Sequence, residues 1–356
     1  MVNINNSSSS ILGGTYRIVS VLGSGVGGNV YRAWHKRLQK HVVIKELIHG
    51  SAFEGESRRT EVEALKNVKS AYLPQVLDFV TEHERSFTVM EFIEGESFDI
   101  LLERGRRFTD SQITRWYGQL ASALEELHRH DICHRDIKPA NIMLTPSGNV
   151  CLIDFNAAMV KGNDSRFVSR SRGYASPEQY KLYKSLKNVR CSAATRGHPP
   201  ENATITKGAE TMLSSEILTC VTSGKIPEKA LAAQPCNIDW KRSDIYSLGA
   251  TMYHMLMCKR PKYNSKEEII LARAEKRHDS KHGNGGESSP CFPIVERSMR
   301  SSPDERFGSA IALSSAIRRV SQKNAKRKIT ESIKAFLIIS IIVLAALLCG
   351  QLRKRC

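Results

Sequence analysis

The sequence lacks any C-x-x-C pair and any cysteine and histidine spacing that is typical of a metal site. Its nine cysteines are scattered over 356 residues, which favours reduced, partly buried thiols over a disulfide framework or a zinc site. The first ten residues also lack the basic and apolar regions of a signal peptide. We therefore expect residues 1–14 to be a short disordered lead-in.

Acidic residues are scarce, since 36 Asp and Glu stand against 53 Lys and Arg, which gives a formal net charge of +17. Such an excess is compatible with nucleic acid, an anionic membrane surface or acidic substrates as partners. Part of it lies in residues 318–334, where only one acid, Glu331, accompanies Arg318, Arg319, Lys323, Lys326, Arg327, Lys328 and Lys334. Because an apolar segment follows, we favour membrane lipid as the partner of a basic juxtamembrane segment, residues 321–334, and expect no nucleic acid. A merely solvated charge run is the alternative.

Charge is absent altogether from residues 335–352. As a helix, this segment would run about 27 Å, close to the hydrocarbon thickness of a bilayer. We predict one transmembrane helix here, with a buried terminal helix as the alternative. More basic residues flank its N-terminal side, so the positive-inside rule predicts a single-pass protein of the cell membrane with the preceding domain in the cytoplasm.

The residue pattern predicts an α+β arrangement with a strand-rich part before a helical part. From residue 16 to 89 the runs YRIVSVLG, GNVYRAW and HVVIKEL are typical of strands, and one helix is expected where Val62, Leu65 and Val68 recur. From Phe98 onward helices dominate, and Asp110 or Ser111 is the expected cap of the longest early one. Residues 181–238 depart from this order and are expected to be a surface insertion with one helix near residues 210–221.

The run LGSGVGGNVY contains Gly23, Gly25 and Gly28 in G-x-G-x-x-G spacing. Glycines let a hairpin backbone approach phosphate oxygens closely, because no Cβ intervenes. Dinucleotide-binding folds share this spacing, but they need a helix directly after the glycines. Here NVYRAW is typical of a strand, so we favour a phosphate-covering hairpin.

A lysine in an apolar strand needs a partner for its charge, and Lys45 stands within VVIKEL. The expected partner is Glu61 on the next helix. We prefer it to Glu63 because a leucine then follows four residues later on the same face. A solvent-facing lysine on an edge strand is the alternative.

The run HRDIKPANIM is the most specific in the chain. Phosphoryl transfer needs an acceptor for the substrate hydroxyl proton, a cation near the transferred phosphate and an oxygen ligand for Mg²⁺. Asp136, Lys138 and Asn141 offer these three functions within six residues. Asp154, just after the apolar run of CLIDFN, offers a second metal ligand.

With these motifs in this order, residues 16–320 without the insertion resemble the eukaryotic-like Ser/Thr protein kinases of bacteria. The resemblance implies a bilobal protein-kinase fold, with an N-lobe at 15–93 and a C-lobe at 94–320. It implies ATP and Mg²⁺ as cofactors, with Mn²⁺ as a substitute, and Ser or Thr hydroxyls of proteins, including its own, as acceptors. The sequence specifies no oligomeric state. The implied catalytic residues are Asp136, Lys138, Lys45 and Glu61; the nucleotide contacts are Leu22, Gly23, Ser24, Gly25, Gly28, Val30, Lys45, Met90, Glu91 and Ile93; the metal ligands are Asn141 and Asp154.

Further motifs support the resemblance. GYASPEQY and SDIYSLGATMYHML look like the substrate-proximal motif and the central helix of the C-lobe. The resemblance implies that Asp244 braces the catalytic loop through backbone hydrogen bonds and that Arg306 pairs with Glu178. Lys138 indicates the Ser/Thr branch of the family. The candidate phosphorylation sites of the activation loop are Ser165, Ser169 and Ser171, the last standing where that branch usually carries Thr.

Two departures from the family pattern are present. Asn156 replaces the glycine of D-F-G. Since Asn tolerates a left-handed backbone, we expect modest consequences. The insertion at 181–238 adjoins the substrate-docking surface. The alternative function is a catalytically silent pseudokinase that acts as a membrane scaffold, which we favour less because every chemistry-bearing residue is present.

Overall fold

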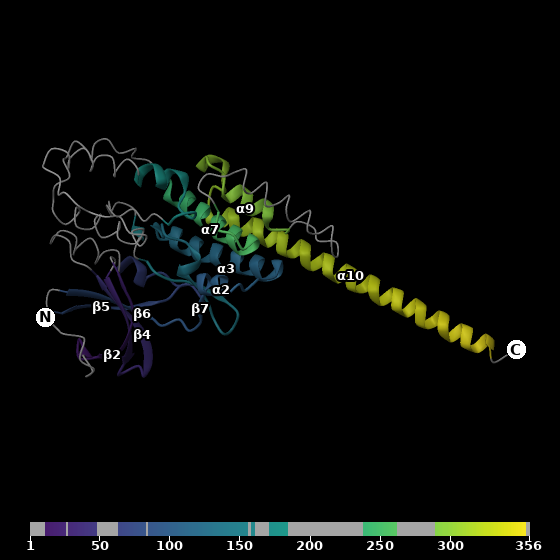
Figure 1. The fold of residues 1–356 in the computed structure, drawn as a ribbon, viewed down its shortest axis with the longest axis horizontal. Helices are drawn as coiled ribbons and strands as arrows, with labels where there is room; N and C mark the ends of the chain where they lie inside the picture. Colours follow the sequence, from purple (N-terminus) through teal and green to yellow (C-terminus); the bar gives the residue numbers. More distant parts are fainter. Residues whose placement is uncertain are drawn as a thin grey trace, which may run out of the picture.

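A computed structural model describes residues 11–25, 28–47, 63–82, 85–155, 158–160, 171–183, 238–261 and 289–353. The strands of the first lobe lie at one end of the molecule, helices form a second lobe beside them, and the last helix runs away from both (Figure 1). This matches the predicted two-lobed α+β arrangement. Several predictions fall outside the described residues: the pair between Glu61 and Lys45, the backbone of Asn156, the phosphorylation sites Ser165 and Ser169, and the helix near residues 210–221.

The N-lobe is an antiparallel sheet in the order β1-β2-β3-β4-β6-β5. Its core contains Tyr31, Ala33, Val42, Ile44 and Val89, and the core residues of β3 and β4 alternate along their strands with less buried residues. This period of two is why these runs form half-buried strands. The strand bounds are β1 Ile11–Leu12, β2 Tyr16–Gly25, β3 Gly28–His35, β4 Lys40–Leu47, β5 Val76–Glu82 and β6 Arg85–Glu91.

The ordered sheet begins earlier than the sequence predicted. Ile11 and Leu12 form β1 and pair with Arg17 and Tyr16 of β2, within the segment expected to be a disordered lead-in. Leu12 is buried in the N-lobe core. One apolar side chain at the sheet edge therefore anchors this part of the lead-in.

The C-lobe is built on two long helices, α3 (Asp110–Arg129) and α7 (Trp240–Met257). Every residue of α7 from Ser243 to Leu256 is buried except His254, so α7 is a central helix that is covered on all sides. Shorter helices pack around this pair: α2 (Phe98–Glu103) and α9 (Phe292–Ser298).

The predicted cap of α3 was wrong by one residue. Thr109 is the N-cap: its side chain accepts a hydrogen bond from the backbone of Gln112, and the Gln112 side chain accepts one from the Thr109 backbone. This reciprocal capping box satisfies two N–H groups that an Asp110 or Ser111 cap would leave to solvent.

Short strands carry the chemistry-bearing loops. β8 (Ile132–Cys133) pairs with β11 (Met159–Val160), and β9 (Ile142–Leu144) pairs with β10 (Val150–Leu152) and with β7 (Glu96–Ser97). A 3-10 turn, Pro139–Asn141, separates β8 from β9, and another lies at Pro303–Glu305. These pairings bring the loop that follows β8 next to the residues that follow β10.

The last helix, α10 (Ala310–Arg353), joins segments that the sequence presented separately. Leu313 and Ile317 are buried in the C-lobe core. Beyond residue 320 the described side chains are exposed except that of Asn324, which is partly buried, and the helix continues away from the lobes (Figure 1). Side chains from residue 343 onward lie outside the described part, and within the described part no helix has the length and apolar character of a membrane span.

Candidate active site

The loop that follows β8, residues 134–141 and here called the catalytic loop, brings together the three residues that the sequence singled out. Lys138 Nζ lies 2.7 Å from Asp136 Oδ2, and Asn141 Nδ2 donates to the backbone oxygen of Asp136 at 2.8 Å and to its Oδ2 at 3.2 Å. The side chain of Asp136 is nearly buried. The carboxylate is therefore held by a cation and an amide with little competition from water, which strengthens both contacts.

A serine hydroxyl from the segment before the substrate-proximal motif lies against the catalytic loop. Ser171 Oγ donates to Asp136 Oδ1 at 2.5 Å and accepts from Lys138 Nζ at 3.2 Å. The structure thus shows that an alcohol fits between this carboxylate and this ammonium group. It also places the predicted phosphorylation site Ser171 against the catalytic loop.

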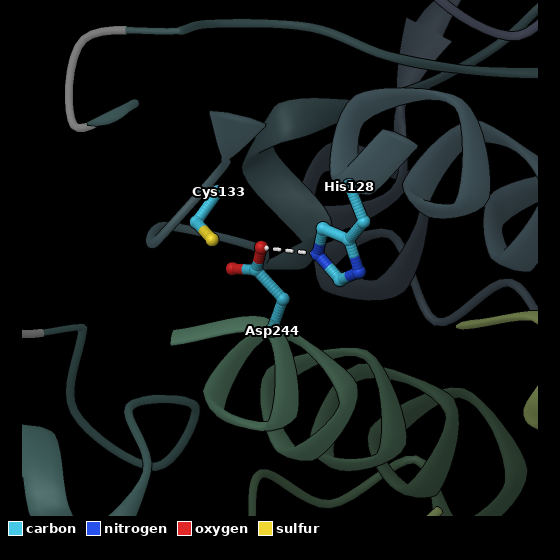
Figure 2. A group of neighbouring side chains, drawn as sticks. All are labelled: His128, Cys133 and Asp244. Atoms are coloured by element: carbon cyan, nitrogen blue, oxygen red, sulfur yellow. Dashed lines mark hydrogen bonds and ion pairs between the residues drawn. The ribbon is translucent and has the colours of Figure 1, made fainter. Parts of the chain in front are cut away.

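Asp244 of α7 holds the backbone of the catalytic loop, as the resemblance implied. Its Oδ2 accepts from the backbone N–H of His134 at 2.8 Å, and its Oδ1 accepts from that of Arg135 at 2.7 Å. His128 Nε2 lies 3.0 Å from Oδ2 (Figure 2). Asp244 is fully buried, so these partners replace water for its carboxylate.

Cys133 completes a buried group with His128 and Asp244 that has the composition of a metal site (Figure 2). Two observations favour a structural role instead. Both oxygens of Asp244 already accept backbone hydrogen bonds. Burial, together with the negative charge of Asp244, raises the pKa of the Cys133 thiol, so it stays protonated and is a poor metal ligand. The group is best described as the brace of the catalytic loop.

Lys45 reaches across from the N-lobe to the end of β10. Its Nζ lies 2.6 Å from Asp154 Oδ1, and the lysine is buried. The edge-strand alternative is wrong, because β4 lies between β3 and β6 and Lys45 pairs with Val30 and Thr88. The ion pair thereby connects the two lobes at the predicted metal ligand.

The two predicted metal ligands are tied to each other through backbone. The N–H of Ile153 donates to the oxygen of Asn141 at 2.8 Å, and His134 Nε2 lies 3.2 Å from the oxygen of Ile153. Asp154 has a left-handed backbone, with φ of 68°, a conformation that non-glycine residues adopt mainly where the surroundings enforce it. One carboxylate and one amide oxygen are the donor types that Mg²⁺ takes in proteins, so the residues fit this ion.

The predicted nucleotide contacts lie along neighbouring strands. In the glycine hairpin Gly23 pairs with Val30, Ser24 with Asn29 and Gly25 with Gly28. On β4, Val42 pairs with Glu91, which ends β6 after the buried Met90. Leu22 is half exposed. The hairpin, Lys45 and the chain before Ile93 are thus parts of one sheet.

The substrate-proximal motif is fixed by buried polar contacts. Arg306 forms the expected pair with Glu178, bidentate at 2.7 and 2.9 Å. Gln179 was not singled out in the sequence, yet its amide nitrogen donates to the backbone oxygen of Arg135 at 2.9 Å. His128 was missed as well. No local pattern marks either residue, since each acts through a partner that is distant in sequence.

Comparison with known proteins agrees with this geometry. Residues 16–189 match the protein kinase domain. The chain is 30% identical over 185 residues to the carbon catabolite-derepressing protein kinase of Saccharomyces cerevisiae, covering 49% of this chain and 29% of the yeast protein. It is 32% identical over 184 residues to a probable serine/threonine-protein kinase of Streptomyces coelicolor, covering 48% of this chain and 27% of that protein.

A human serine/threonine-protein kinase, Nek5, is 33% identical over 184 residues, covering 49% of this chain and 26% of its own length. The chain therefore spans less than a third of the length of these relatives. The matched residues make up just under half of the chain and contain the glycine hairpin, Lys45 and the catalytic loop. This part is similar to protein kinase domains of the serine/threonine type, and the pseudokinase alternative is not favoured.

Proposed function

We propose that this chain is an ATP-dependent protein serine/threonine kinase. The observation that carries the proposal is a hydroxyl held between Asp136 and Lys138, with Asn141 bound to the same aspartate. ATP, bound with Mg²⁺, would supply the γ-phosphoryl group and the charge neutralisation that its transfer needs.

Each residue of the kinase site has a defined task in this proposal. Asp136 orients an acceptor hydroxyl and takes its proton, and Lys138 offsets the charge that develops next to it. Lys45 holds Asp154 in place across the two lobes, while Asp154 and Asn141 would hold Mg²⁺. Asn156 in place of the D-F-G glycine leaves this set of groups complete.

The direct test is phosphate transfer from radiolabelled ATP to a generic protein acceptor by the full chain in detergent, with Mg²⁺ and then Mn²⁺. We expect label on serine and threonine of the acceptor and of the chain itself. Nucleotide binding without any transfer under both metals would contradict the proposal and would support a pseudokinase scaffold instead.

We also propose that α10 anchors the kinase domain in the cell membrane as a single-pass helix, with the kinase domain in the cytoplasm. Apolar side chains of residues 336–342 point to every side of the helix: Phe336 is 69% exposed and Ile341 65%. A helix that is apolar all round needs an apolar surrounding. This exposure argues against the alternative of a terminal helix packed on the C-lobe. The basic segment 321–334 would then lie against anionic lipid.

Removing residues 334–356 should move the protein from the membrane pellet to the soluble fraction without loss of kinase activity. The expectation rests on the buried contacts of α10, which end by residue 320, so the truncation removes no part of the C-lobe core. Fractionation with and without detergent is the measurement. Full-length protein that stays soluble without detergent would defeat the anchor.

A further inference from the structure

Three exposed cations lie in the two chain segments that meet at Gly173: Arg172, Lys259 and Arg260, here called the basic rim. Arg172 directly follows Ser171. Lys259 and Arg260 follow α7, in a segment that packs on Gly173: a Cβ at this glycine would lie 2.5 Å from the oxygen of Pro261 and 2.9 Å from Arg260 Cγ. Only a glycine, with φ of 85°, allows this approach. Two segments about ninety residues apart are thereby held together at the site.

The basic rim lies within reach of residues that flank the acceptor. Ser171 Oγ lies 2.5 Å from Asp136, the residue that orients the acceptor hydroxyl in the proposed function, and Arg260 touches Gly173, two residues further on. Two residues of chain span at most about 7 Å, and an extended peptide advances about 3.3 Å per residue. A side chain two or three positions from the acceptor can therefore meet Arg260.

Tyr174 and His254, the titratable groups next to Arg260, are neutral at pH 7. The Tyr174 hydroxyl lies 2.7 Å from His254 Nδ1, and the Arg260 guanidinium lies 5.8 Å from the centre of the Tyr174 ring. Burial, reinforced by Arg260, lowers the pKa of His254 to about 4, so this histidine is neutral at pH 7. Burial raises the pKa of Tyr174 to about 12. One acid, Asp99, also acts on Tyr174; its carboxylate accepts from Ser97 Oγ at 2.5 Å.

We infer that the kinase domain selects acceptor serines and threonines that have acidic side chains within three positions, and that the basic rim makes the selection. The inference rests on the proposed kinase activity. A peptide carboxylate near Arg260 gains Coulomb attraction, whereas a basic side chain there is repelled. Since exposed charges are screened by salt, the preference should weaken as ionic strength rises.

The test compares serine peptides that differ only in the three residues on each side of the acceptor: Asp, the isosteric Asn, or Arg. With the full chain in detergent we expect kcat/KM for the Asp peptides to exceed that for the Asn peptides on the order of tenfold. The Arg peptides should be poorer than the Asn peptides. Placing Asp on one side at a time then shows which flank meets the rim.

Arg260→Gln should bring the ratio of kcat/KM for the Asp peptides to that for the Asn peptides closer to one. Arg260→Glu should reverse the preference, so that kcat/KM is highest for the Arg peptides. Arg37→Gln makes the same charge change at an exposed position in the turn between β3 and β4 and should leave the ratio unchanged. Thermal melts of both variants show whether the fold is kept. An equal or inverted preference in the wild type, or an unchanged ratio in both Arg260 variants, would overturn the inference while transfer to a generic acceptor still supports the kinase. Absence of all transfer would instead remove the proposed function.

Discussion

Replacing Asp136 by Asn should reduce phosphoryl transfer by about 10²–10⁴-fold, the range typical of a lost general base. The substitution keeps the size of the side chain, and the bond from Asn141 to the backbone oxygen of Asp136 is independent of it. What is lost is the charge that Lys138 and the acceptor hydroxyl face. ATP affinity should change little, because Asp136 acts on the acceptor rather than on the phosphates.

Single-turnover phosphorylation and a fluorescent-nucleotide titration on the same preparation separate the two effects. Arg129→Gln is a suitable control, since this arginine is exposed and forms its ion pair with Glu126 of the same helix. A variant that phosphorylates itself near the wild-type rate would refute the assignment of Asp136. A variant that also loses nucleotide binding would place Asp136 in ATP binding instead.

The chemistry-bearing residues could be predicted from the sequence because most of them lie in short continuous runs. Six residues carry Asp136, Lys138 and Asn141, and the loop that contains them folds around its own hydrogen bonds. The strands of the N-lobe could likewise be predicted, because a half-buried sheet imposes a period of two on its residues. In both cases the information is local.

Contacts between distant segments could not be predicted in this way. Arg260 approaches Gly173 only because the chain after α7 turns back onto the substrate-proximal motif, and no residue pattern encodes that return. The continuity of α10 was missed for the opposite reason. Its buried, basic and apolar parts differ so much in composition that the sequence predicts three separate segments. The backbone hydrogen bonds of a helix do not depend on side-chain polarity, so one helix runs through all three.

Replacing Asp244 by Ala should lower the free energy of unfolding by about 3–5 kcal/mol, a large share of the about 5–15 kcal/mol that typically stabilises a folded domain. The carboxylate is fully buried and accepts from the backbone of His134 and Arg135. Without it two buried N–H groups lose their acceptor, at about 1–3 kcal/mol each. His128 would lose its partner as well.

The comparison with Asp304→Ala makes this expectation specific. The Asp304 side chain is 90% exposed and pairs with Arg242 at the surface, so its loss should cost about 0–1 kcal/mol. The loss in free energy of unfolding for Asp244→Asn should lie between those of the two alanine variants. An amide keeps one oxygen acceptor but turns an NH₂ group toward the second backbone donor. Denaturant midpoints followed by fluorescence of the buried Trp116 measure all three variants. If Asp244→Ala unfolds at the same midpoint as Asp304→Ala, the catalytic loop is held by something other than α7, and the ordering of Asp136 must come from the loop's own contacts with Lys138 and Asn141.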